Sequence, residues 1–138
     1  MISRRDLLEN SGALLLLGAL PQAQTQGGGA GGGVLFTHDL PELTLKNWSV
    51  TAVEVAYAPG QSSAAHRHPG ITIAYVLEGE IRSKVGDQPE ATYSAGQMFI
   101  ESPGELHAVS ANASTTRPAK LLALLLAEKG KPLTTPEK

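Results

Sequence analysis

Short runs of apolar and β-branched residues, separated by turns that contain Gly or Pro, recur along the middle of the chain. Residues 49–57 alternate, are rich in valine, and stop at Pro59-Gly60. Such a run is typical of a β-strand followed by a turn. Comparable segments follow at residues 71–77, 81–85, 91–93, 98–100, 106–110 and 119–127. Their short, regular spacing predicts an all-β domain.

One of these segments is ambiguous. Residues 121–126 read Leu-Leu-Ala-Leu-Leu-Leu, and these residue types are strong helix formers. Propensity alone would favour a helix here. We predict a buried strand instead, because the strands before it need a closing partner.

The first residues are typical of a targeting segment. Arg4-Arg5 is followed by two leucines, and the apolar run Ala13–Leu20 is too short to span a bilayer. This pattern predicts a Tat-type export signal over residues 1–23, with a short amphipathic helix as the alternative. The chain has no cysteine, so it lacks a lipidation site for an anchor. We therefore expect a bacterial protein that is periplasmic or otherwise exported by the Tat route, with no stable membrane anchor after processing.

The rest of the chain divides by composition. Residues 24–33 are rich in Gly and Gln and predict a flexible linker. Residues 34–129 carry the strand pattern and predict the folded domain. Residues 130–138, with two prolines, predict a loose tail.

Composition narrows the function. A chain of 138 residues allows one core, and the lack of cysteine excludes disulfides and thiolate metal sites. The net charge of −2, with 17% charged residues, gives no footprint for nucleic acid. We expect a small-molecule ligand or substrate. Trp48 and Tyr75 are interpreted as core residues, with pocket lining as the alternative.

Histidines carry the candidate chemistry. His66 and His68 are two residues apart, so on a strand both imidazoles face the same side. His107 follows the turn Ser102-Pro103-Gly104 and can join them if the fold brings a second strand alongside. Three neutral imidazoles form a good site for a divalent transition metal, namely Fe, Mn, Zn or Ni. Solvated edge residues are the alternative. His38 has no partner pattern and is interpreted as an exposed imidazole.

These two histidine segments resemble the two sequence motifs of small single-domain bacterial cupins, of the cupin type-2 family. The resemblance covers about 95 residues. The matching positions in the first motif are Gly60, His66, His68 and Gly79, and those in the second motif are Gly96, Gly104 and His107. The resemblance implies a cupin-type jelly-roll β-barrel that binds a metal through His66, His68 and His107. It also implies a homodimer as one option, since cupins often dimerise through strand exchange.

The chain departs from the first motif at one ligand position. Thr72 stands where the family has a glutamate, and it is a poor metal ligand. Glu101 is the acid of the second motif that could reach the metal, orient a histidine or act in catalysis; a surface acid is the alternative. Whether Glu101 or Thr72 contributes to the site stays open at this point.

Two classes of function remain open, because fold does not give function. The first is a mononuclear three-His metal enzyme of dioxygenase or isomerase type that acts on a small molecule, such as an Fe(II)-dependent dioxygenase. The second is a non-catalytic barrel that binds a small molecule or a metal.

Overall fold

The computed structural model describes residues 32–138, and these form strands and turns without any helix. The strands are β1 (Trp48–Tyr57), β2 (Ser62–Ser63), β3 (His66–Arg67), β4 (Ile71–Glu78), β5 (Glu80–Val85), β6 (Ala91–Ser94), β7 (Met98–Glu101), β8 (Leu106–Asn112), β9 (Ala119–Glu128) and β10 (Thr135–Pro136). In this part of the chain no helix is long and apolar enough to cross a membrane. The export signal expected over residues 1–23, and nearly all of the linker expected over residues 24–33, lie outside the described residues.

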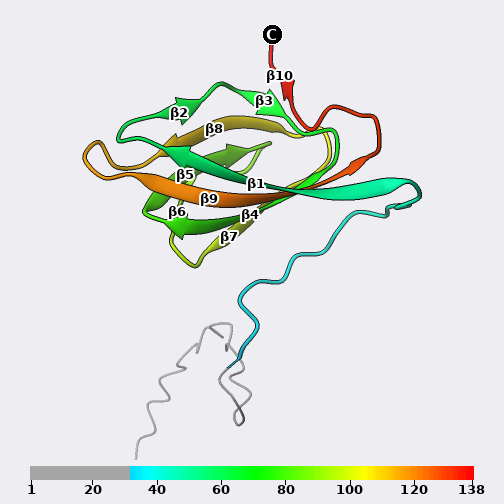
Figure 1. Ribbon diagram of the computed structural model, residues 1–138, viewed down its shortest axis with the longest axis horizontal. Helices are drawn as coiled ribbons and strands as arrows, with labels where there is room; N and C mark the ends of the chain where they lie inside the picture. The colour runs from blue at the N-terminus through cyan, green and yellow to red at the C-terminus, as the bar shows by residue number, and fades with distance from the viewer. Residues whose placement is uncertain (1–31) are drawn as a thin grey trace, which may run out of the picture. The chain divides into compact units, whose positions relative to one another are not determined.

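Two antiparallel sheets face each other (Figure 1). One has the order β1-β9-β4-β7, and the other has the order β10-β3-β8-β5-β6, with β2 also paired to β8. Neighbours such as β4 and β9 are distant in sequence, which is the long-range pairing of a jelly roll. The two sheets do not join into one continuous ring of strands. The prediction of an all-β jelly roll is confirmed, with the barrel made of two facing sheets.

The leucine-rich segment is the strand β9, drawn in orange in Figure 1, and it pairs with both β1 and β4. Its odd-numbered residues are buried, while its even-numbered residues from Lys120 to Leu126 are half-buried on the other face. Lys120 lies on that other face, next to Glu54 of β1. The strand prediction for this segment is therefore confirmed. Pairing on both edges and burial of one face outweigh its helix propensity.

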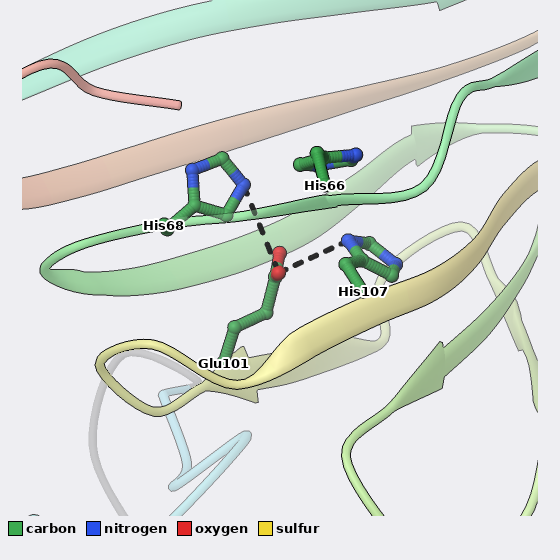
Figure 2. A group of neighbouring side chains, drawn as sticks. All are labelled: His66, His68, Glu101 and His107. Carbon is green, nitrogen blue, oxygen red and sulfur yellow. Dashed lines mark ion pairs between the residues drawn. The ribbon is translucent and has the colours of Figure 1, made fainter. Parts of the chain in front are cut away.

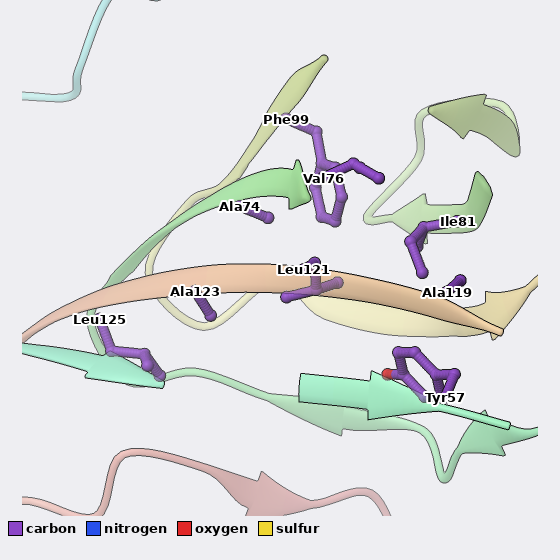
Figure 3. Packing of buried hydrophobic residues seen from close by; sticks show 9 residues of the cluster. All are labelled: Tyr57, Ala74, Val76, Ile81, Phe99, Ala119, Leu121, Ala123 and Leu125. Atoms are coloured by element: carbon purple, nitrogen blue, oxygen red, sulfur yellow. The ribbon is translucent and has the colours of Figure 1, made fainter. Parts of the chain in front are cut away.

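Alternate residues of the strands build the core between the sheets (Figure 3). Most of its members come from the first sheet, and Ile81 of β5 comes from the second. The buried cluster comprises Tyr57, Ala74, Val76, Ile81, Phe99, Ala119, Leu121, Ala123 and Leu125. Trp48 and Tyr75 do not belong to it and are only half-buried, so their interpretation as core residues is wrong. Tyr75 alternates with the buried residues of β4 and therefore lies on the opposite face of that strand.

Close approach of β4 and β9 requires a glycine at the start of β4. A Cβ built on Gly70 would lie 1.9 Å from the carbonyl oxygen of Leu126. The turn between β4 and β5 has a similar requirement, because Gly79 has φ of 68° and a Cβ there would lie 2.6 Å from the Pro118 oxygen. Both glycines fix how the two sheets connect.

Strand β8 contains a bulge that decides which of its side chains face inward. Ser110 pairs with Ser83 and His107 pairs with Val85, so Ala108 is an extra residue between these pairs. In a regular strand, side chains three positions apart would face opposite sides. The bulge lets both His107 and Ser110 be buried between the sheets.

The C-terminal segment is not the loose tail that its composition predicts. Its strand β10 pairs with β3, and the Glu137 carboxylate accepts hydrogen bonds from the Arg67 guanidinium at 2.8 and 3.2 Å. Leu133 packs against the core cluster. These contacts hold residues 130–138 beside the histidine-bearing strand β3, so that expectation is wrong.

Candidate metal centre

Three of the four histidines meet on the second sheet. His66 of β3 is the direct cross-strand partner of His107 of β8, and His68 follows β3 on the same side as His66. The ring centroids of His66 and His68 lie 4.9 Å apart, and those of His66 and His107 lie 5.0 Å apart. The structure thus brings together the three imidazoles that the sequence singled out. His38 is exposed and stacks on Phe36 instead.

Glu101, the last residue of β7, points into this cluster (Figure 2). Glu101 is 3% exposed, so its interpretation as a surface acid is wrong. Oε2 lies 3.0 Å from His107 Nδ1 and 3.7 Å from His68 Nε2. The cluster therefore has four side chains, three imidazoles and one carboxylate.

The pairing of β4 with β7 explains why the carboxylate comes from β7 although the motif position lies on β4. Thr72 of β4 and Glu101 of β7 are directly paired in register, and both are buried. Paired residues of neighbouring strands project side by side from the same face. Glu101 therefore brings a carboxylate beside the position that the family's motif would fill from β4.

Each imidazole is held by a hydrogen bond to one ring nitrogen. Nδ1 of His66 donates to the Ala64 carbonyl at 2.7 Å, and Nδ1 of His68 donates to the Leu133 carbonyl at 2.8 Å. A carbonyl oxygen only accepts, so both of these Nδ1 atoms carry the proton and both Nε2 atoms keep a free lone pair. His107 is held in the opposite sense, with Nε2 bonded to Ser83 Oγ at 2.9 Å and Nδ1 toward Glu101.

Three buried polar atoms in and beside the cluster lack a hydrogen-bond partner. Glu101 Oε2 and His107 Nδ1 are fully buried and have no hydrogen-bond partner, and the same is true of Thr72 Oγ1. Buried polar atoms are normally paired, so such a concentration of unpaired polar atoms calls for a bound group. One ligand atom from each of the four side chains lies within 4.8 Å of all the others. Ligands on opposite sides of one transition-metal ion are roughly 4.2 Å apart, so this group of atoms could hold a single ion after the side chains move inward slightly.

Electrostatics favours the neutral, metal-binding form of His66. Burial lowers the pKa of its imidazole from the usual value, and the nearby rings of His107 and His68 lower it further. The hydrogen bond to Ala64 and the charge of Glu101 act in the other direction. Since the net shift is downward, His66 keeps its free lone pair to lower pH than an exposed histidine does.

Sequence reasoning missed the groups that orient the three clustered histidines. Ser83 lies on β5, 24 residues before His107, and Leu133 lies 65 residues after His68. Alternation in β5 is the one signal that places Ser83 on the inner face. A backbone carbonyl such as that of Leu133 leaves no mark in the sequence.

Comparisons with known proteins agree with this fold. A family model described as "Cupin domain" matches residues 53–125. No curated protein matches the chain. Among solved structures, the chain is similar to a Klebsiella pneumoniae protein with a double-stranded β-helix domain, with 25% identity, coverage of 67% of this chain and 78% of that one, and a TM-score of 0.53.

Two enzymes share the fold at lower identity. An oxalate oxidase in complex with the substrate analogue glycolate is 22% identical to this chain, with a TM-score of 0.54. The match covers 62% of this chain and 45% of the oxalate oxidase chain. A DMSP lyase from Ruegeria pomeroyi is 22% identical to this chain, with a TM-score of 0.55. The match covers 64% of this chain and 43% of the lyase chain. The chain thus spans less than half the length of either enzyme, and these two likenesses show the fold alone. The match of the family model over more than half of the residues shows that the chain belongs to the cupin family.

Proposed function

We propose that this cupin holds a single divalent transition metal (Fe, Mn, Zn or Ni) through His66, His68 and His107, with Glu101 as the fourth ligand. One observation carries the proposal: a carboxylate oxygen and an imidazole nitrogen are buried 3.0 Å apart, and neither has a hydrogen-bond partner. Imidazole nitrogen together with one carboxylate oxygen is a donor set that suits these metals.

The reaction that we propose is that of a mononuclear metal enzyme of dioxygenase or isomerase type. A bound metal would supply a Lewis acid, and with Fe(II) a site for oxygen. The supporting observation is that the four side chains line a cavity of about 490 Å³, which has the size of a small-molecule pocket. The shared fold of an oxalate oxidase and a DMSP lyase shows that such barrels carry enzymes.

One observation favours the alternative, a non-catalytic binding barrel. Among the described residues that line the cavity, Glu101 is the sole carboxylate, and a carboxylate that binds a metal is not free to act as a general base. The Tyr57 hydroxyl is already bonded to Ser63 Oγ and Ser110 Oγ, at 2.7 and 2.8 Å. An enzyme here would therefore depend on its metal and on groups of the substrate.

Metal analysis of purified variants tests the proposal. His66→Ala, His68→Ala and His107→Ala should each remove most of the bound metal at pH 7.5, because each deletes one strong ligand. His38→Ala is the matched control, and it should retain the wild-type metal content. Stoichiometric metal in all three variants would refute the site. Oxygen uptake by the Fe(II)-loaded protein, with candidate substrates, then separates an oxygenase from a binding barrel.

We also propose export by the Tat route to the periplasm of a bacterium. The twin arginine Arg4-Arg5 and the short apolar run Ala13–Leu20 support this. Tat carries folded proteins, so the metal can be loaded before export. Replacement of both arginines by lysine should leave a folded precursor in the cytoplasm, and continued export of that variant would indicate another route. Sedimentation velocity on the mature protein tests the homodimer that the cupin resemblance implies.

A further inference from the structure

The cavity beside the metal cluster has two unlike walls. One wall carries the three histidines of the second sheet, together with Glu101 at the end of β7. The other wall consists of apolar side chains of β1 and β9, which belong to the first sheet. The apolar residues that line the cavity include Val53, Val55, Ala74, Leu121, Ala123 and Leu125. The hydroxyl groups of Ser63, Thr72, Ser110 and Thr134 are further polar groups of the lining, so most of the surface that a metal-bound ligand meets is hydrocarbon.

Positive charge is absent from this lining. Among the described residues of the cavity wall there is no lysine or arginine. The nearest cations along the chain are directed elsewhere: Arg67 pairs with Glu137, and Lys120 pairs with Glu54, all with substantial exposure. Alternation explains this arrangement, since Lys120 is adjacent to the inward-facing Leu121 on β9. An anionic ligand could therefore be neutralised only by the metal.

Charge balance then limits the ligand. A divalent ion, one carboxylate and three neutral imidazoles carry a net charge of +1. A singly charged ligand makes the buried site neutral. A doubly charged ligand leaves a negative charge in a cavity without a cation, and an unpaired buried charge is unfavourable. An ion with six ligands keeps two positions beyond the four side chains, which suits a bidentate ligand.

Small side chains provide the space for the body of the ligand. Ala74 of β4 and Ala123 of β9 are direct cross-strand partners, and both line the cavity. Larger residues at these two positions would fill the room between the sheets. Leu121 and Leu125 lie two positions on either side of Ala123 and face the same way. The space is suited to a compact apolar group such as a phenyl ring.

We propose that the cavity binds a singly charged, bidentate oxygen chelator with a compact apolar body, and that Ala123 sets the size of that body. This rests on the proposed metal centre. It excludes small dianions as preferred ligands, because their second charge finds no lysine or arginine in the wall.

Hydroxamates test the proposal, because they chelate as monoanions through two oxygens. Benzohydroxamate and acetohydroxamate have the same head and differ in their bodies, and oxalate is the dianionic comparison. Each is titrated into Co²⁺-loaded protein and followed by visible absorption, and each affinity is divided by the ligand's affinity for aqueous Co²⁺. We expect benzohydroxamate to bind at least about tenfold more tightly than acetohydroxamate, because its ring is buried, and oxalate to rank last.

Two variants of β9 test whether Ala123 determines the preference for the larger hydroxamate. Ala123→Leu should weaken benzohydroxamate at least tenfold and change acetohydroxamate less than about threefold, with the cobalt content unchanged. Leu122→Ala, on the other face of β9, is the control and should leave the ratio of the two affinities as it is in the wild type. The comparison of ligands on the unaltered protein does not depend on how the variants fold. Equal affinities for the two hydroxamates, or a preference for oxalate, would overturn this proposal and leave the metal centre standing, whereas failure to bind cobalt would overturn both.

Discussion

Replacement of Glu101 by glutamine should change stability and metal affinity in opposite directions. In the metal-free protein Glu101 is 3% exposed, and its Oε2 has no hydrogen-bond partner. Leaving a buried polar atom unpaired costs about 1–3 kcal/mol, and more when the group is charged. His107 Nδ1 lies 3.0 Å from the present carboxylate oxygen. A neutral amide can pair with this nitrogen in either tautomer, because its NH2 group donates and its carbonyl oxygen accepts. We expect Glu101→Gln to stabilise the metal-free protein by at least about 1 kcal/mol, or about 4 °C in Tm.

The same change should weaken metal binding. If Glu101 only oriented a histidine, its replacement would lower the affinity by about 10- to 100-fold. If it is a ligand, as proposed, the loss should equal that of His107→Ala. Thermal denaturation with a chelator present, and metal titration of the apo protein, give the two numbers separately.

Controls make this test specific to the cluster. Glu105→Gln alters an exposed acid four residues further along, and should change neither measurement. The single variant Glu101→Thr should lose metal binding. The double variant with Thr72→Glu moves the carboxylate to the paired position on β4 and should recover that binding. A metal-free Glu101→Gln protein that is less stable than wild type, together with unchanged metal affinity, would refute the reasoning and would indicate a proton shared with His107.

Three further outcomes follow from the structure. Removal of residues 132–138 deletes the carbonyl that orients His68, and should lower metal affinity about 10- to 100-fold in a titration while the rest of the barrel stays folded; unchanged affinity would contradict that role. Burial lowers the pKa of His66 below its unfolded value of 6.5, so the folded state binds fewer protons. The free energy of unfolding of the metal-free protein, measured by urea denaturation, should therefore fall as pH drops through 6.5 toward the pKa of the folded state. It should fall less steeply in His66→Asn, and an equal pH dependence in both proteins would refute this. Gly70→Ala should destabilise the fold by about 1–3 kcal/mol or more, since its methyl group would meet the Leu126 carbonyl, and a normal Tm would contradict the clash.

Local pattern predicted the strands because each strand buries one face. The alternation and the turns place β1, β4 and β9 within one or two residues of their observed ends. The same rule places His66 and His68 on one side. Local pattern could not reveal the bulge at Ala108, which sets the orientation of His107, because a bulge depends on how β8 pairs with β5.

Pairing between distant segments explains why the C-terminal segment was predicted incorrectly. A glycine and two prolines within residues 130–138 are typical of a loose end. Its order comes from β3, through the pairing of β10 and the ion pair between Arg67 and Glu137. These contacts join residues about 70 positions apart, so the segment's own composition carries no trace of them.

The position of the carboxylate follows from a similar non-local cause. A motif read along the chain assigns the acidic ligand to one position of one strand, and Thr72 occupies that position here. A metal ion requires only that an oxygen lie at the right place, and the neighbouring strand can supply it when the register pairs the two positions. Thr72 and Glu101 are paired in this way, and the carboxylate of Glu101 lies within 4 Å of two of the histidines. A missing acid in the first motif therefore does not imply a missing ligand in this fold, provided that the paired position on β7 carries one.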